Sequence, residues 1–114
     1  NPYSPTCTLR PPTAEVLRVA ARFIQIVERH YRTEVVVYSA PDFWERNNVA
    51  RLKRDLWLRS TAEHVEKSYN TRAWRFWQYT STGVLDGIGK DVDLNCFNGS
   101  QAQWNRWRKR RAVR

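Results

Sequence analysis

The chain has 114 residues, a formal net charge of +9 and 41% hydrophobic residues. This length and composition indicate a single folded domain with a modest core and exclude a disordered chain. No apolar run reaches the length that a membrane-spanning helix needs, and no signal-peptide pattern is visible. The six Trp residues favour the binding of sugars, bases or a protein partner, because a large aromatic face can be partly buried and partly presented.

In the first part of the chain, residues 1–12 hold four of the five prolines and predict an extended loop. Thr13 is expected to cap a helix over residues 14–30, where apolar positions recur every three or four residues. The Val-rich segment Glu34–Ser39 predicts a buried strand. Pro41 ends this strand and opens a short helix.

Three further strands are expected, at Asp55–Ser60, Trp74–Thr80 and Asp91–Phe97. Ser100 and Gln103 have the spacing of a capping box and predict the start of a last helix. A leading helix followed by buried strands favours an α/β architecture.

Alternation along these strands separates two faces. One face is apolar or aromatic throughout, which suits a cover of helices. The other face changes from apolar to polar along the first three strands. If all four strands are parallel, the polar residues meet at one end of the sheet, where β/α barrels build their active sites; they are Tyr38, Arg59, Gln78, Asp93 and Asn95. The alternative is that these groups only satisfy one another inside the fold.

The C-terminal residues 106–114 hold six of the 20 basic residues and no acidic residue. Such a segment can hold nucleic acid or an anionic cell surface. It can equally be a solvated helix end whose cations complement the helix dipole.

Several segments resemble one family of enzymes. The segments "FWQYTSTGVLDGI" and "VDLNCFNGS" resemble the C-terminal signature of the glycoside hydrolase family 25 lysozymes, which cleave peptidoglycan. Upstream, "VVVYSAPDFWERN" and "LWLRS" are similar to two earlier strand segments of that family. The resemblance extends from about Pro11 to Trp107. It implies a partial β/α barrel, strands five to eight of the family's eight, with residues 1–107 as the C-terminal half and 108–114 as a basic tail.

The resemblance also implies roles for individual residues. Asp93 matches the aspartate of the family's Val-Asp-Leu-Asn motif and is expected to act as a supporting catalytic carboxylate. Tyr38, Gln78 and Asn95 match positions that line the sugar cleft, and Arg59 occupies a variable position there. The family's Asp-x-Glu motif, whose Glu is the acid/base, has no counterpart in this chain.

The function expected from the resemblance is hydrolysis of the β-1,4 bond between N-acetylmuramic acid and N-acetylglucosamine. The chain itself is expected to be an inactive fragment of such a lysozyme, since glycoside cleavage needs a carboxylic acid that the chain does not supply. The absence of Met also suggests a processed product or a fragment. Such a protein is expected to be secreted or to face the cell envelope.

Expected partners are peptidoglycan glycan strands and either the missing N-terminal half of the barrel or a second copy. No cofactor is expected, and no cluster has metal-ligand spacing. Cys7 and Cys96 either pair or remain two thiols. Two other functions remain open: a non-catalytic domain that binds the wall, and, with less support, a basic module that binds nucleic acid.

Overall fold

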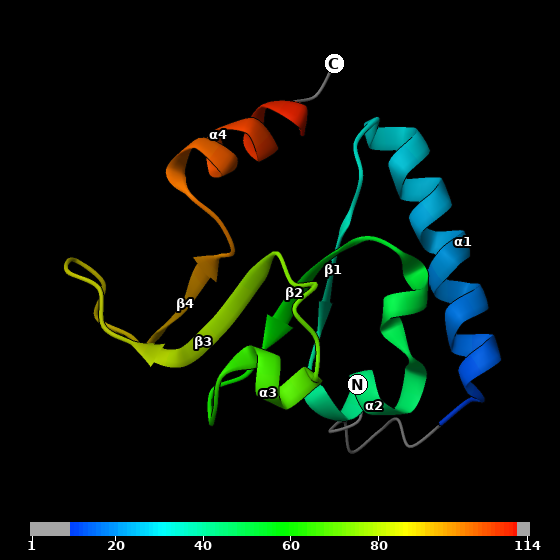
Figure 1. Cartoon of the computed structure of the whole chain (residues 1–114), viewed down its shortest axis with the longest axis horizontal. Coiled ribbons are helices and arrows are strands. Elements are labelled where there is room, and N and C mark those ends of the chain that lie inside the picture. Colours follow the sequence, from blue (N-terminus) through cyan, green and yellow to red (C-terminus); the bar gives the residue numbers. More distant parts are fainter. Residues whose placement is uncertain (1–9, 112–114) are drawn as a thin grey trace.

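The computed structural model describes residues 10–111 of the chain. They form a mixed α/β fold with a four-stranded sheet (Figure 1). In chain order the elements are α1 (Thr13–Tyr31), β1 (Val36–Ser39), α2 (Pro41–Asn47), the 3₁₀ helix η1 (Val49–Leu52), β2 (Asp55–Arg59), α3 (Val65–Tyr69), β3 (Phe76–Gly83), β4 (Val92–Phe97) and α4 (Gln101–Arg110). All the helices and strands expected between residues 10 and 111 are confirmed, with small shifts at their ends. The loop expected at residues 1–9 and the residue Cys7 lie outside the described residues.

The start of α1 differs from the prediction. Pro12 is the N-cap residue, and no side chain caps the helix. Thr13 is instead the first helical residue, and its hydroxyl donates a hydrogen bond to the carbonyl oxygen of Arg46, at 2.8 Å. The expected Thr13 cap is therefore wrong, because Pro12 already provides the extended backbone that precedes a helix. The hydroxyl ties α1 to the end of α2.

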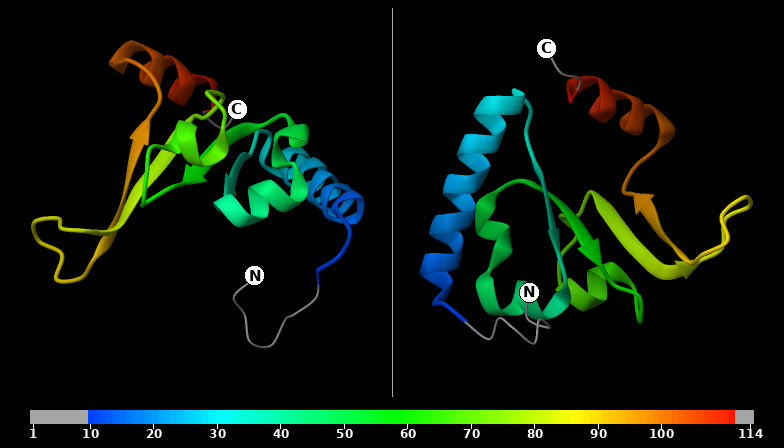
Figure 2. Two further views of the ribbon diagram at one scale, coloured as in Figure 1. Left: turned by 60° about the horizontal axis from the view of Figure 1, so that its bottom comes forward. Right: turned by 180° about the vertical axis from the view of Figure 1, so that it is seen from behind.

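The sheet has the order β1-β2-β3-β4. β1, β2 and β3 are parallel, whereas β4 runs antiparallel to β3. The expectation that all four strands could be parallel is therefore wrong for β4. The connection over residues 84–91 contains no helix and is too short for a parallel crossover, which needs a dozen or more residues. The hairpin formed by β3 and β4 extends away from the body of the molecule (Figure 2).

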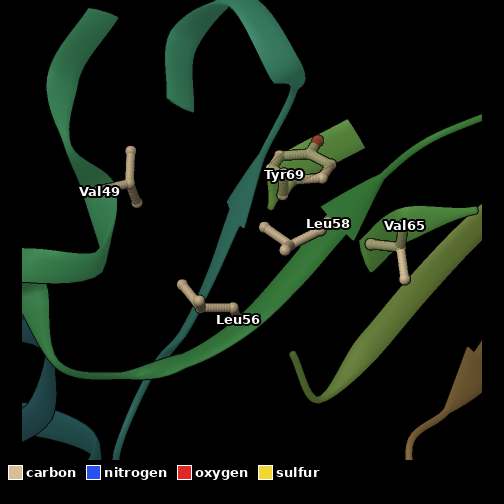
Figure 3. Close-up of a cluster of buried hydrophobic side chains, with 5 residues drawn as sticks. All are labelled: Val49, Leu56, Leu58, Val65 and Tyr69. Atoms are coloured by element: carbon tan, nitrogen blue, oxygen red, sulfur yellow. The ribbon is translucent and has the colours of Figure 1, made fainter. Parts of the chain in front are cut away.

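The core lies on the face of the sheet that the alternation pattern assigned to helices. Leu56 and Leu58 of β2 pack against Val49 of η1 and against Val65 and Tyr69 of α3 (Figure 3). Leu58 and Val65 have no exposed surface. Burial of these side chains holds η1 and α3 onto the sheet through the hydrophobic effect.

Two of these covering elements, η1 and α3, were not predicted. Helix α3 has only five residues, which is too short for apolar periodicity to show. His64 begins it: its Nδ1 accepts a hydrogen bond from the backbone N–H of Glu66, at 3.1 Å. Because isolated helices of this length are unstable in water, α3 depends on its packing against β2.

The last helix, α4, begins with the predicted capping box. The backbone N–H of Gln103 donates to the Ser100 hydroxyl, and the Gln103 side chain accepts from the backbone N–H of Ser100. The helix continues through residues 108–110, within the segment expected to be a basic tail. It lies at the end of the sheet where β1, β2 and β3 begin (Figure 1).

Candidate functional site at the carboxyl ends of the strands

The second face of the sheet, which we call the polar face, carries the residues singled out from the sequence. Tyr38 of β1, Arg59 of β2, Gln78 of β3 and Asn95 of β4 lie on it. The register pairs Arg59 with Gln78 and Gln78 with Asn95, so three of the four are neighbours across the strands. The sheet therefore brings polar side chains from all four strands together near the carboxyl ends of β1 to β3.

The first contact on this face joins Tyr38 to Gln78. The Tyr38 hydroxyl donates a hydrogen bond to Oε1 of Gln78, at 2.6 Å, although the two residues belong to strands that are not adjacent. Gln78 is buried, with 4% of its surface exposed, while Tyr38 is 47% exposed. Burial of the phenol raises the pKa of Tyr38; the charge of Arg59 opposes this effect and that of Asp93 adds to it. The phenol therefore stays protonated at neutral pH and acts as a donor.

A second contact joins Trp57 to Asn95. The indole Nε1–H of Trp57 donates to Oδ1 of Asn95, at 2.7 Å, across the intervening strand β3. The ring of Trp57 also lies edge-on to Tyr38, with 5.2 Å between the ring centroids. Sequence reasoning placed Trp57 on this face but gave it no role in the site. Its alternation with Arg59 on β2 was the signal that could have identified it.

In these two contacts the amide oxygens of Gln78 and Asn95 accept hydrogen bonds, which leaves the amide nitrogens for a ligand. An indole N–H can only donate, so the Asn95 atom that faces it must be the oxygen. Within the described part of the chain, neither Gln78 Nε2 nor Asn95 Nδ2 has a hydrogen-bond partner. Both side chains therefore present amide N–H groups, which suit the carbonyl and hydroxyl oxygens of a sugar ring and its acetamido group.

Asp93 lies on β4 two residues before Asn95, and its side chain is exposed. Because side chains alternate along a strand, Asp93 and Asn95 share the polar face. The antiparallel direction of β4 places Asp93 nearer than Asn95 to the carboxyl end of β3. Asp91, in contrast, precedes β4 and belongs to the connection from β3.

Tyr69 supports this end of the sheet from the opposite face, and sequence reasoning missed it. Its hydroxyl donates to the carbonyl oxygen of Arg59, at 2.5 Å, and lies 3.0 Å from that of Ser39. These carbonyls belong to the last residues of β1 and β2. Burial is the main cause of the raised pKa of Tyr69. The protonated hydroxyl therefore ties together the ends of the two strands that carry Tyr38 and Arg59.

Among residues 10–111 there is neither a metal-binding cluster nor a helix that could span a membrane. No group of three or more His, Cys, Asp and Glu residues there has an arrangement that could hold a metal ion. None of the helices in this range is long and apolar enough to cross a membrane. Cys96 is exposed, with its Sγ 3.6 Å from the carbonyl oxygen of Phe97.

Comparisons with known proteins agree on one family. The sequence model of the glycosyl hydrolases family 25 matches residues 6–88. The uncharacterized protein YegX of Escherichia coli O157:H7 is 28% identical over 89 residues, which are 78% of this chain and 33% of YegX. Lysozyme M1 of Streptomyces globisporus is 36% identical over 78 residues, which are 61% of this chain and 26% of the lysozyme.

Two solved structures that superpose on this chain are described as a family 25 glycosyl hydrolase and as a bacterial lysozyme. A family 25 glycosyl hydrolase from Bacillus anthracis superposes with a TM-score of 0.77 at 28% identity, over 91% of this chain and 49% of that one. A lysozyme from Streptomyces coelicolor superposes with a TM-score of 0.70 at 26% identity, over 89% of this chain and 50% of that one. The chain thus spans about half the length of these structures and about a third of the length of YegX.

Proposed function

Because the chain belongs to glycosyl hydrolase family 25, we propose that it forms part of a lysozyme that cleaves peptidoglycan. The bond broken is the β-1,4 link between N-acetylmuramic acid and N-acetylglucosamine. The observation that carries this proposal is the exposed amide of Asn95, whose oxygen is taken by Trp57, beside the buried amide of Gln78 and the exposed carboxylate of Asp93 on the same face. A glycan strand lying across the carboxyl ends of the strands would meet all three.

In this proposal each site residue has a stated role. The amides of Gln78 and Asn95 donate hydrogen bonds to the sugar, and Tyr38 and Trp57 hold those amides in orientation. Arg59, the last residue of β2, is proposed to bind the substrate as well. Asp93 is the supporting carboxylate, which stabilises positive charge as it develops on the sugar ring.

Cleavage also requires a carboxylic acid that protonates the leaving oxygen. On the polar face near the carboxyl ends of β1 to β3, Asp93 is the carboxylate available, because Asp55 on the same face of β2 lies at the opposite end and accepts hydrogen bonds from Trp107 and Arg111. We therefore propose that the acid/base comes from outside these 114 residues, in a domain of the length that the related structures have. The chain by itself is then inactive, and β1 to β4 are the last four strands of a β/α barrel.

An apolar hollow of about 730 Å³ supports this proposal. It lies between α1 and β1, at the free edge of the sheet. Phe23 and Val19 of α1 line it and are 65% and 52% exposed. An additional strand and helix would cover both these side chains and the unpaired backbone groups of β1. The partner is either the other half of such a barrel or a second copy of this chain, and the assembled protein works at the cell envelope after secretion.

A second candidate function is the binding of peptidoglycan without cleavage. The observation that favours it is that Asp93 is the one carboxylate near the carboxyl ends of the described parallel strands on the polar face, since Asp55 is engaged by Trp107 and Arg111 at the other end. This function uses the same sugar contacts and needs no acid/base. The two candidates therefore differ in turnover and agree in saccharide binding.

The test is to incubate the 114-residue chain with purified cell walls and to measure reducing ends, together with N-acetylglucosamine oligomer binding by titration calorimetry. We expect no turnover and weak binding that falls about two- to tenfold in Asn95→Ala, since a ligand hydrogen bond of typical strength is lost. Turnover by the chain alone that disappears in Asp93→Asn would overturn the fragment proposal. Binding that is unchanged in Asn95→Ala would overturn the proposed site.

A further inference from the structure

Charge is divided between the two ends of the sheet. The connection after β2 carries Glu63, which pairs with Lys67, and the β3–β4 connection with β4 carries the exposed acids Asp86, Asp91 and Asp93 and one lysine, Lys90. The opposite end, where β1 to β3 begin and α4 lies, is rich in Arg and Lys. Two adjoining hollows of about 400 and 420 Å³ mark this end, which we call the basic end. Their basic lining residues are Arg32, Lys53, Arg54, Arg72, Arg75, Arg110 and Arg111.

Part of this charge is used within the fold. Arg54 pairs with Glu28 at 2.8 Å, and Asp55 is shared by Arg75 and Arg111. The remaining cations are exposed and form no ion pair within residues 10–111. Among the lining residues they are Arg32, Lys53, Arg72 and Arg110, and α4 adds Arg106, Arg108 and Lys109. Each of these cations lies either in a segment that precedes a parallel strand or in α4. Because parallel strands begin at the same end of a sheet and α4 lies there too, the cations are close together.

The spacing of the basic residues along α4 also brings their charges together. Residues three and four apart on a helix share a face, so Arg106, Lys109 and Arg110 present their charges together. No acidic residue occurs in α4. The packed side of the same helix carries Trp107, whose Nε1–H donates to Asp55 at 2.6 Å. Because the Trp107–Asp55 hydrogen bond fixes the packed side of α4 against the sheet, the basic side of the helix faces away from the sheet.

The tryptophans at this end are packed within the fold. Trp104 and Trp107 stack on each other with 5.6 Å between centroids, and Phe76 lies edge-on to both. The guanidinium of Arg111 lies over Trp107, at 4.6 Å from the ring centroid. Binding of single-stranded nucleic acid usually uses aromatic rings on which bases can stack. Here Trp104 and Trp107 are packed within the fold, and Tyr31, which is 59% exposed beside Arg32, adds one exposed ring. One ring gives little surface for stacking a run of bases, which favours a polyanion without bases.

We propose that the basic end binds a repeating phosphodiester polymer of the cell envelope, of the kind that is attached to peptidoglycan. This proposal rests on the proposed function for its choice of polymer, and it uses a different surface. Phosphates spaced along a flexible chain can contact cations from several segments at once, each contact releasing counterions. The polymer is attracted to the basic end and repelled by the acids at the sugar-binding end. Both ends can therefore engage the wall together.

The experiment measures retention of the 114-residue chain on two preparations of cell walls, at salt concentrations from about 50 to about 300 mM. One preparation carries a polyol-phosphate polymer, and the other has had that polymer removed with hydrofluoric acid. We expect the chain to bind the intact walls at least about tenfold more tightly at low salt, with an affinity that falls steeply as salt increases. Equal retention on both preparations would overturn the proposal and would leave the proposed glycan site intact.

Two triple variants test the surface. Arg106→Gln/Lys109→Gln/Arg110→Gln should lower affinity for the intact walls by about tenfold or more and reduce the salt slope, because up to about three phosphate contacts are lost. The matched control removes the same number of positive charges elsewhere, with Arg46→Gln/Lys67→Gln/Lys90→Gln, and should keep most of the affinity. Equal losses in both variants would show an effect of net charge alone and would overturn the basic end as the site. Tighter binding to a single-stranded oligonucleotide with the same number of phosphates would also overturn it, in favour of nucleic acid.

Discussion

At the scale of single residues, the site depends on which atom of an amide faces the ligand. Trp57 and Tyr38 each donate to an amide oxygen, so the two amide N–H₂ groups are left for a substrate. A donor-only indole removes the ambiguity that an amide otherwise has. The site is therefore polarised: it offers donors from β3 and β4, and a carboxylate from Asp93.

Two variants separate the contribution of the Trp57–Asn95 hydrogen bond to stability from the contribution of the Asn95 amide to saccharide binding. Asn95→Asp keeps an oxygen acceptor for Trp57 but removes the amide donors. We expect its unfolding free energy to stay close to that of the original chain and its saccharide binding to fall about two- to tenfold. Trp57→Phe removes the N–H donor and should lower the unfolding free energy by about 0.5–1.5 kcal/mol. Urea denaturation and calorimetric titration measure these effects; unchanged saccharide binding in Asn95→Asp would contradict the assigned polarity.

At the scale of elements, a single carboxylate joins α4 to the sheet. Asp55 begins β2 and accepts hydrogen bonds from Trp107, at 2.6 Å, and from Arg111, at 2.9 Å. Burial opposes the charge of Asp55, but these two hydrogen bonds and the charges of Arg75 and Arg111 together outweigh burial and lower the pKa of its carboxyl. The helix is thus fixed to the start of a core strand by charge and hydrogen bonding.

Asp55→Asn should release α4 from the sheet. At neutral pH we expect the unfolding free energy to fall by about 1–3 kcal/mol, because hydrogen bonds to a charged group are lost. The folded-state pKa lies below the ordinary value of 3.8, so the contribution of Asp55 is fully present above that pH. It is lost as pH falls through the lower folded-state value. Urea unfolding measured from about pH 2 to neutral pH should therefore show that the unfolding free energy of the original chain falls at low pH. In Asp55→Asn this fall should be smaller.

The control for this variant is Asp86→Asn, which removes an exposed carboxylate from the connection between β3 and β4. It should leave both the stability at neutral pH and its acid dependence nearly unchanged. Equal effects of the two substitutions would contradict the anchoring role of Asp55.

At the scale of the whole molecule, the apolar hollow between α1 and β1 determines whether the isolated chain self-associates. Val19 and Phe23 line this hollow and are more than half exposed. Contiguous apolar surface of this kind promotes association, and the free edge of β1 adds unpaired backbone groups beside it.

We expect the isolated chain to self-associate, with a sedimentation mass above 13.6 kDa that rises with concentration. Val19→Ser/Phe23→Ser should shift the chain toward the monomer, since the apolar side chains that drive association are lost. The matched control is Val84→Ser/Leu85→Ser in the β3–β4 connection, where both side chains are at least half exposed. A chain that stays monomeric at all concentrations and melts cooperatively would contradict this expectation.

Much of the fold follows from local patterns in the sequence. Val-rich and alternating segments predicted the four strands, and the same alternation separated Leu56 and Leu58 from Tyr38 and Gln78. Ser100 and Gln103 predicted the start of α4. These patterns are informative because side-chain direction along a strand and capping at a helix end depend on residues only a few positions apart.

The sequence by itself therefore determined the four strands, the helices α1, α2 and α4, the two faces of the sheet and the resemblance to family 25, but not η1 or α3. The tertiary structure alone decided the antiparallel direction of β4, the orientation of the Asn95 amide, and the ties made by Tyr69 and Asp55. Trp57 and Asn95 are 38 positions apart, and Asp55 and Trp107 are 52 apart. Contacts over such separations leave no local periodicity, because they exist only once the strands have paired and the helices have packed on them.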